Sequence, residues 1–464
     1  MDQPSNTSDD AARGVTNAFE AQRWLQKRNI EDIECIIPDQ AGVARGKMMP
    51  SAKFFSSDTM AMPGSIFIQT ITGEYPAEDA HFKHDPTDGD IQIVPDYSTL
   101  TVVPWESDPT AQLIHDAVRR DGTPLKRAPR EVLRSVVALY EARGLKPVVA
   151  PELEFYLVKP NTDSHEPIQP PIGRSGRPEA GRQSYSISAL NEFDEVIDDI
   201  YDFSEAQGLE IDTLIHEEGA AQMEINLRHG DPLELADQAF LFKRTIREAA
   251  LRHNMYATFM AKPMSQQPGS AMHIHQSVVD IETGQNIFST ADGEPTQAFY
   301  HFIGGHQKYL PAVMCMLAPY VNSYRRVARA LVTAPINVHW GYDNRTVGLR
   351  VPDSKAQARR LENRVPSSDA NPYLAIAASL AVGYLGLVEE LEPEAAIEGW
   401  GRDKPFGLPR WLLDAVALFE DCDPLKDVLG ESFVHTYRAI KLSEFETFMG
   451  VISPWEREHL LLQV

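Results

Sequence analysis

The sequence contains few cysteines, no excess of basic residues and no secretion-type N-terminus. Its three cysteines, Cys35, Cys315 and Cys422, are widely spaced and form no CxxC pattern, so neither a disulfide framework nor a thiolate metal site is indicated. The 43 Lys and Arg residues against 67 Asp and Glu residues give a net charge of −24, which argues against nucleic acid and anionic membrane as partners. The N-terminal segment MDQPSNTSDDAARG is polar and acidic, unlike a signal peptide. We also expect no apolar run near the roughly 18 residues that a membrane span needs. These absences predict a cytoplasmic protein.

The length and local patterns predict two domains. A chain of 464 residues exceeds the length at which a single core usually stops growing. We expect residues 1–15 to be a disordered tail, residues 16–120 to form a small β-rich domain, and residues 121–464 to form a larger domain in which strands and helices alternate. The Pro- and Gly-rich segment 160–181 is expected to be a mobile surface loop.

Two acidic segments place carboxylates on one face of a strand. In PELEFYL, Glu152 and Glu154 stand at i and i+2 of a β-favouring run, so both side chains project from the same face. In HEEGAAQMEIN, Glu224 shares a strand face with Gln222, and Glu217 precedes it across a glycine-containing turn. Such carboxylates repel one another unless a cation lies between them. For the first pair, a solvent-facing strand edge is the alternative interpretation.

A histidine pair strengthens the metal interpretation. The segment GSAMHIHQS places His273 and His275 on one strand face. A single histidine is more often structural, but a His-x-His strand together with acidic strands favours metal binding. Carboxylate-rich coordination suits Mg²⁺ or Mn²⁺, whereas structural zinc favours cysteine and histidine. Because several acids are available, we predict two or more ions, the arrangement that neutralises phosphate charge during phosphoryl transfer.

Arginines are concentrated toward the C-terminal half of the chain. Arg360, Glu362 and Arg364 alternate onto one strand face. A solvated basic face is one interpretation, but a glutamate between two arginines indicates a metal ligand flanked by groups that bind phosphate or carboxylate. Further arginines of this region are Arg325, Arg326, Arg345, Arg350 and Arg359.

With these clusters in order, the chain resembles the glutamine synthetase superfamily, closest to its γ-glutamylpolyamine synthetase branch. The motifs that carry the resemblance are PELEF, QME, KPM, the segment from Gly269 to His275, NSYRR, Asn344-Arg345, and RLENR through NPY at Asn371–Tyr373. The resemblance implies an α+β fold, with a small N-terminal β-grasp domain and a large catalytic α/β domain built on a curved antiparallel sheet with helices. It also implies an ATP-dependent carbon–nitrogen ligase that activates glutamate through γ-glutamyl phosphate before an amine attacks.

The same resemblance implies roles for individual residues. The metal ligands would be Glu154, Glu217 and Glu224 for the ion nearer glutamate, and Glu152, His273 and Glu362 for the ion nearer the nucleotide. Nucleotide or phosphate would be bound by His275, Ser277, Arg345, Arg350 and Arg360. Substrate would be bound by Glu154, Gly269, His273, Arg326 and Arg364. Catalytic roles would fall to Arg345, Arg326 and Glu74. The family resemblance further implies a homo-oligomer, a hexameric ring or a stacked dodecamer, whose active sites are shared between subunits.

The resemblance fails where the family binds ammonia. Glutamine synthetases carry an Asp-Gly-Ser-Ser segment whose aspartate binds ammonium, but this chain has Ile71–Pro76, with Glu74 as the nearest acid. Thr333 stands where a glutamate closes over ammonium in those enzymes. Fewer anionic groups remove the preference for a small cation and leave room for a substituent. We therefore expect γ-glutamylation of an amine larger than ammonia: a polyamine, or an alkyl or aromatic monoamine. Phe67 and Tyr75 suit either a bulky substituent or the protein core.

Three other functions remain open from the sequence. The first is ammonia-dependent glutamine synthesis with Glu74 in place of the missing aspartate. The second is a non-catalytic relative that senses nucleotide or glutamate. The third is a metal-dependent hydrolase built around His273 and His275, which would not need so many arginines.

Overall fold

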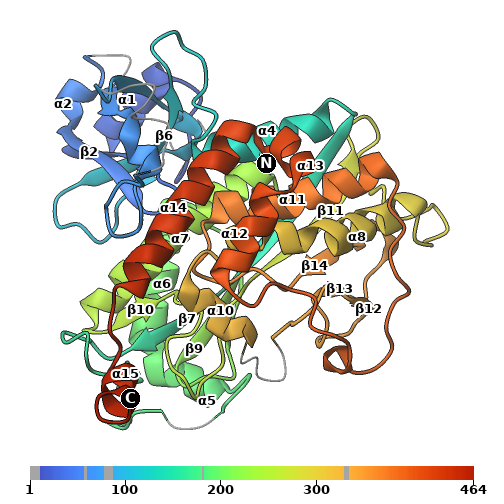
Figure 1. Ribbon diagram of the computed structural model, residues 1–464. Coiled ribbons are helices and arrows are strands. Elements are labelled where there is room, and N and C mark those ends of the chain that lie inside the picture. Colours follow the sequence, from blue (N-terminus) through green and yellow to red (C-terminus); the bar gives the residue numbers. More distant parts are fainter. Residues whose placement is uncertain (1–10, 57–59, 78–86, 180–181, 329–333) are drawn as a thin grey trace.

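The computed structural model describes residues 11–56, 60–77, 87–179, 182–328 and 334–464 (Figure 1). Residues 1–10 of the expected tail and Thr333 lie outside the described residues. Val15 is buried, and the carbonyl oxygen of Ala11 accepts hydrogen bonds from the side chains of Trp24 (2.9 Å) and Arg28 (3.0 Å). Residues 11–15 therefore pack against the first helix, α1 (Ala18–Lys27).

The N-terminal region folds around a six-stranded sheet, in the order β2-β1-β6-β4-β3 with β5 paired to β6. Its strands are β1 (Asp32–Pro38), β2 (Ala44–Pro50), β3 (Met60–Pro63), β4 (Asp90–Pro95), β5 (Thr101–Val102) and β6 (Thr110–Val118), with the short helices α2 (Ser51–Phe54), η2 (Gly64–Ile68) and η3 (Tyr97–Thr99). Strands β1 and β6 are parallel, and the other pairs are antiparallel. Helix α1 buries Ala21, Trp24 and Leu25 in the core of this sheet. The expected small N-terminal β domain is confirmed.

A second, eight-stranded sheet forms the centre of the catalytic region, in the order β12-β13-β14-β11-β7-β9-β8 with β10 paired to β7. Its strands are β7 (Leu145–Val158), β8 (Ile211–His216), β9 (Gln222–Leu227), β10 (Tyr256–Thr258), β11 (Met272–Asp280), β12 (Trp340–Tyr342), β13 (Leu349–Val351) and β14 (Leu361–Asn363). All of its strand pairs are antiparallel except β12 with β13. On β7, Leu153, Phe155 and Leu157 enter the main core, so the intervening Glu152 and Glu154 face away from that core.

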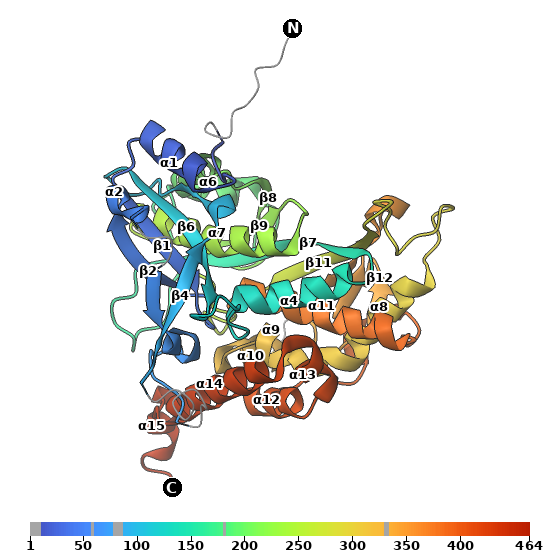
Figure 2. The same ribbon diagram turned by 90° about the horizontal axis from the view of Figure 1, so that it is seen from above.

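Helices cover the apolar face of this sheet (Figure 2). The longer helices are α4 (Pro129–Glu141), α6 (Asp194–Gln207), α7 (Pro232–Arg252), α8 (Gln297–Tyr309), α10 (Val321–Ala328), α11 (Pro372–Glu389), α12 (Leu412–Glu420), α13 (Asp423–Leu429), α14 (Glu431–Met449) and α15 (Pro454–Leu460). The short ones are α5 (Ile187–Leu190), η4 (Asn191–Phe193), η5 (Leu310–Val313), α9 (Met314–Leu317), η6 (Ala356–Ala358) and η7 (Gly401–Asp403). Helices α4 and α7 contact β7, and α11 contacts α4, α7 and α8. The predicted α+β fold is confirmed.

Helix α11 corrects the expectation about apolar segments. Its 18 residues have a mean hydropathy of 1.4, which is long and apolar enough to cross a membrane. However, 78% of this stretch is buried inside the protein, because α11 packs among α4, α7 and α8. A helix that is apolar on all sides suits the middle of a large core. In this fold α11 is a core element.

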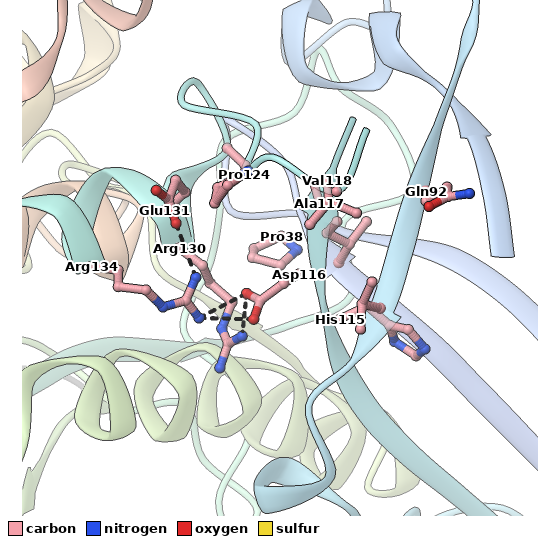
Figure 3. A pocket seen from close by; sticks show the side chains of 14 residues that line it. Pro38, Gln92, His115, Asp116, Ala117, Val118, Pro124, Arg130, Glu131 and Arg134 are labelled. Carbon is pink, nitrogen blue, oxygen red and sulfur yellow. Dashed lines mark hydrogen bonds and ion pairs between the residues drawn. The ribbon is translucent and has the colours of Figure 1, made fainter. Parts of the chain in front are cut away.

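Arg130, near the start of α4, links the small sheet to the catalytic region. Its buried guanidinium donates hydrogen bonds to Asp116 on β6 (2.6 Å), to Asp96 (2.8 Å) and to Asp237 on α7 (2.7 Å). Figure 3 shows Arg130 and Arg134 on one side of Asp116, at the edge of a cavity of about 400 Å³ between β6 and α4. Burial alone would lower the pKa of Arg130, but the charges of Asp237 and Asp116 raise it above its usual range. The guanidinium therefore joins the two regions as a fixed cation.

Candidate active site

The register of β7, β9 and β11 brings the predicted metal ligands together. Glu152 lies opposite His273 of β11, and Glu154 lies opposite Glu224 of β9. The ring of His273 lies 3.2 Å from Glu152, between Nδ1 and Oε2. Because these side chains alternate with core residues, they share the face of the sheet that points away from the helices. Glu154, Glu224 and His273 are each only 7% exposed.

Strand β14 adds a second row to this face. Glu362, 1% exposed, lies opposite His275 of β11 and Arg350 of β13. Its carboxylate accepts hydrogen bonds from Arg350 (2.7 Å) and Arg364. Burial raises the pKa of Glu362, but the positive charge of Arg364 outweighs burial, and the pKa lies at about 2. Glu362 is thus an anion with its charge already compensated by arginines.

Two groups of side chains have the geometry of a metal site. In each group the candidate ligand atoms lie within 4.8 Å of one another, and Glu152 belongs to both: with His275 and Glu362, and with Glu224 and His273. These groups differ from the predicted partition of ligands in one member, because Glu224, expected at the ion nearer glutamate, is grouped with Glu152 and His273. His275, expected at the nucleotide, lies 2.7 Å from Glu152. Oxygen-rich groups with neutral imidazoles are donors that divalent ions accept.

The pKa values of the carboxylates fit a site built for cations. Burial, and then the charge of Glu217, raise the pKa of Glu154 to about 8. Burial, and then the charges of Glu152, Glu154 and Glu217, raise the pKa of Glu224 to about 10. The pKa of Glu217 is also raised, mainly because this carboxylate is buried. A divalent cation between these groups would favour their charged forms and reverse the shifts. The donor set therefore suits a divalent metal ion.

The neighbouring histidines lower the pKa of Glu152. Burial raises the pKa of Glu152, but the hydrogen bonds to His273 and His275 lower it by more than burial raises it. The pKa of Glu152 therefore lies well below the usual range. The ring of His275 lies between Glu152 and Arg360: its Nε2 is 2.7 Å from Oε1 of Glu152, and its Nδ1 accepts a hydrogen bond from Arg360 (3.1 Å). Burial and Arg364 lower the pKa of His273 to about 4, so this ring is neutral. A neutral imidazole can act as a metal ligand, and both histidines belong to the candidate metal groups.

Two cavities meet at Glu152 and Asn226. The first, about 470 Å³, is lined by most of the predicted site residues: Glu152, Glu154, Glu217, Glu224, Gly269, His273, Arg326, Arg345, Arg350, Glu362 and Arg364. The second, about 390 Å³, is lined by His275, Ser277 and Arg360 together with Glu152 and Asn226. The residues predicted to bind nucleotide are therefore divided between the two cavities: Arg345 and Arg350 line the first, and His275, Ser277 and Arg360 line the second.

Arg326 and Gly269 are packed against each other at the first cavity. Arg326 is 4% exposed, and its guanidinium donates to the backbone oxygens of Val365 (2.8 Å) and Arg364 (3.0 Å). Burial lowers its pKa to about 10, so it remains charged at neutral pH. A Cβ at Gly269 would lie 2.6 Å from the Cγ of Arg326 and 2.7 Å from the oxygen of Ala261. Only glycine lets this turn approach the arginine so closely.

The predicted catalytic residue Glu74 is not part of these cavities. It is exposed, and its carboxylate accepts hydrogen bonds from Thr72 (3.3 Å) and from Thr447 on α14 (3.1 Å). The described residues that line the first cavity all come from position 152 onward. Of the two nearby aromatic residues, Phe67 is fully buried in the small domain and Tyr75 is 44% exposed.

Sequence reasoning missed the segment that precedes α5. Ser184 and Tyr185 line the first cavity, and the Tyr185 amide donates to the backbone oxygen of His216 (2.8 Å). Glu179, at the end of a loop expected to be mobile, has a side chain only 3% exposed and accepts from the amide of Ala221 (2.6 Å) and from His216 (3.1 Å). No periodicity signals these contacts, because they form between an irregular loop and the turn between β8 and β9.

Comparison with known proteins identifies the family. Residues 126–460 match the family described as "Glutamine synthetase, catalytic domain". The chain belongs to the glutamine synthetase family. Within that family it is 37% identical to gamma-glutamylputrescine synthetase PuuA of Escherichia coli (strain K12), over 97% of this chain and 96% of the relative. It is 32% identical to glutamate–isopropylamine ligase of Pseudomonas sp, over 93% of this chain and 95% of the relative.

Solved structures agree with the glutamine synthetase fold. The structure named "Apo GmaS without ligand" superposes with a TM-score of 0.82 at 28% identity, over 97% of this chain and 100% of that one. "GmaS/ADP complex-Conformation 1" gives the same TM-score over 95% and 99%. The family resemblance inferred from the motifs is thereby confirmed. Enzymes of the glutamine synthetase family use ATP and divalent metal ions, and the carboxylate and histidine groups on β7, β9, β11 and β14 can hold such an ion.

Proposed function

We propose that this protein is an ATP-dependent ligase that joins the γ-carboxylate of L-glutamate to an amine larger than ammonia. The observation that carries the ligase chemistry is the meeting of two cavities at Glu152, one rich in carboxylates and arginines and the other lined by His275, Ser277 and Arg360. A nucleotide in the second cavity would direct its phosphates to the metal groups, and glutamate in the first would reach them from the opposite side. The names of the two relatives, a putrescine and an isopropylamine ligase, support the choice of amine.

The reaction has two balanced steps. An oxygen of the glutamate γ-carboxylate attacks the γ-phosphorus of ATP, and ADP leaves as γ-glutamyl phosphate forms. The amine nitrogen then attacks the acyl carbon, loses a proton, and phosphate leaves. Divalent ions, when bound, neutralise the phosphate oxygens. Arg345, Arg350 and Arg364 supply charge-assisted hydrogen bonds to phosphate or carboxylate, and Glu362 holds the last two in place.

We assign the remaining roles from the resemblance and the cavities. Two or more Mg²⁺ or Mn²⁺ ions would be held by Glu152, Glu154, Glu217, Glu224, His273 and Glu362, with His275 as a further donor to one of them. The nucleotide would contact His275, Ser277, Arg345, Arg350 and Arg360. Gly269, Arg326 and Arg364 would bind glutamate. The reaction would take place in the cytoplasm, where ATP and glutamate are available.

We also propose a homo-oligomeric ring, as a hexamer or a stacked dodecamer, with active sites shared between subunits. The position of Glu74 supports sharing, because it is exposed and lies outside the cavities of its own chain. Light scattering on the purified protein measures the assembly. Mixing inactive Glu74→Ala and Glu362→Ala subunits tests the sharing: activity should return in the mixture, because some sites then combine two intact contributions. If the Glu74→Ala enzyme alone keeps full activity, Glu74 has no catalytic role.

The choice of amine is tested with a panel of substrates. ATP hydrolysis is measured with glutamate plus ammonium and with glutamate plus polyamines, alkylamines and aromatic amines, and γ-glutamyl products are identified by mass spectrometry. We expect saturable turnover with at least one amine and weak turnover with ammonium. Efficient turnover with ammonium that no amine matches would show a glutamine synthetase instead. Nucleotide binding without turnover of any substrate would show a non-catalytic relative.

A further inference from the structure

Glu218 is an acidic residue of the first cavity that belongs to neither of the two candidate metal groups. It lines the cavity beside Tyr185 and Ile215, on the turn after β8. The other acids among the described lining residues are Glu152, Glu154, Glu217, Glu224 and Glu362, which are all predicted metal ligands. The side chain of Glu218 is 27% exposed, so its carboxylate is reachable from the cavity mouth. This wall combines an anion, an aromatic ring and an aliphatic side chain.

The partner of Glu218 within the chain is a replaceable cation. Arg182 forms an ion pair with Glu218, with Nη1 of the arginine 3.0 Å from Oε1 of the glutamate. The arginine side chain is 58% exposed, and Arg182 is absent from the described lining of the cavity. Exposed ion pairs of this kind contribute little to stability, because water solvates both charges well when they separate. A cation that enters through the cavity can therefore take the place of Arg182 at small cost.

We propose that Glu218 binds the distal ammonium of a diamine substrate, replacing Arg182, and so makes the enzyme prefer diamines to monoamines of equal length. This inference rests on the proposed amine ligase function. A diamine carries a second charge into the cavity, and that charge loses hydration unless an anion compensates it. Glu218 supplies the anion, while Tyr185 and Ile215 contact the methylene chain and the ring of Tyr185 adds a cation–π contribution. The apolar end of a monoamine gains nothing from Glu218.

Glu218 directly follows a predicted metal ligand in the chain. Glu217, its neighbour in the chain, is a predicted ligand of the ion nearer glutamate, and its pKa is affected by Glu152 and Arg364 of the same cluster. Glu217 and Glu218 both line the first cavity, so a diamine that reacts near the predicted metal ligands enters the cavity that Glu218 lines.

The test compares 1,4-diaminobutane with n-butylamine, which has the same carbon chain without the distal ammonium. Values of kcat/KM for both amines are measured on the intact enzyme, Glu218→Gln and Arg182→Gln. We expect Glu218→Gln to lower kcat/KM for the diamine by about tenfold, mainly through KM, because one partner of a charged contact is lost. Butylamine turnover should stay within about twofold. Arg182→Gln should raise kcat/KM for the diamine, because the competing cation is gone.

The opposite signs of the two variants separate recognition from structural damage. If the ion pair only stabilised the turn, both variants would lower turnover of both amines, and the proposal would be overturned. Equal use of the two amines by the intact enzyme, unchanged in Glu218→Gln, would overturn it while leaving the ligase function standing. No turnover of any amine would instead reject the ligase function. Glu420→Gln is the matched control, since Glu420 is also paired with an arginine (Arg438, 2.6 Å) but on α12, and both amines should react normally.

Discussion

Neighbouring carboxylates of the site differ in charge because their partners differ. Glu152 and Glu362 accept hydrogen bonds from histidine or arginine side chains, and their pKa values are low. Glu154 and Glu224 are buried among other carboxylates, and their pKa values are raised. The first pair is therefore charged before a metal binds, whereas the second pair exchanges protons for the cation.

Metal stabilisation should increase with pH. The folded-state pKa values of Glu154 and Glu224, about 8 and about 10, lie above the unfolded value of about 4.3. Their contribution to stability without metal is complete below pH about 4 and is lost as pH rises through the folded-state values. Divalent ions compensate the charges that then appear. The rise in Tm on adding Mg²⁺ or Mn²⁺ to EDTA-treated protein should be larger at pH about 8 than at pH about 6, and an equal or smaller rise would contradict the assignment.

Removal of either of two carboxylates should abolish ligation. Glu154→Ala removes a predicted metal ligand on β7, and Glu362→Ala also leaves Arg350 and Arg364 without the carboxylate that holds them. We expect ADP release with glutamate and amine to fall by a factor of about 10³ or more, because phosphoryl transfer depends on charge neutralisation. The variants should keep the oligomeric state of the parent. Retained activity would refute their assignment as ligands.

At the scale of elements, the turn before β11 positions substrate-binding groups through close packing. Its carbonyl at Gly269 accepts a hydrogen bond from Gln222 (3.1 Å), and the missing side chain makes room for Arg326. The turn between β8 and β9 works similarly, because a Cβ at Gly219 would lie 2.0 Å from the hydroxyl of Tyr156. Both turns thus hold functional side chains by excluding larger residues.

Gly269→Ala should impair glutamate binding more than nucleotide binding. The added methyl group meets Arg326 and the oxygen of Ala261, so the arginine must move, at a cost of about 1–3 kcal/mol. We expect the KM for glutamate to rise about tenfold while the KM for ATP changes little. Gly407→Ala is the control, since the nearest atom to its added methyl is 3.5 Å away. Equal effects of the two substitutions, or an effect on ATP alone, would contradict the placement of glutamate.

At the scale of the whole molecule, the two sheets are joined by a buried charge network centred on Arg130. The guanidinium is bound by acids from the small domain and from α7, and Tyr373 at the start of α11 donates to the same Asp237 (2.7 Å). Removing one partner of such a network leaves buried charges without compensation. The network therefore couples the placement of the small domain to the core helices.

Arg130→Met should destabilise the protein strongly. We expect a loss of about 3–5 kcal/mol in the free energy of unfolding, because Asp237 stays buried without its cation. Arg134→Met is the matched control: Arg134 also binds Asp116 (2.8 Å) but its side chain is 39% exposed, so its loss should cost about 1 kcal/mol or less. Denaturant unfolding of both variants measures the difference. Equal losses would show that the network does not depend on the burial of Arg130.

The family and the fold class could be predicted from the sequence, and most of the predicted site residues line the two cavities, because these features depend on local spacing. Glu152 with Glu154, and His273 with His275, share a strand face whatever the rest of the chain does. The limits of the two domains, residues 16–120 and 121–464, stay a prediction. Composition alone could not assign helix α11, because its apolar sequence suits both a membrane span and a core helix. The helices packed around α11 show that it is a core helix.

Contacts between distant segments were decided only by the tertiary structure. The sharing of Glu152 between two metal groups follows from the register of β7 with β9 and β11 and of β11 with β14. The exclusion of Glu74 from the cavities, and the inclusion of Tyr185 and Glu218, depend on how loops cross those strands. Such contacts join residues far apart in the chain, and no periodicity records them. The sequence determined which charged groups the protein brings to its site, and the packing of the strands determined which of them meet, because electrostatic interaction depends on distance in space.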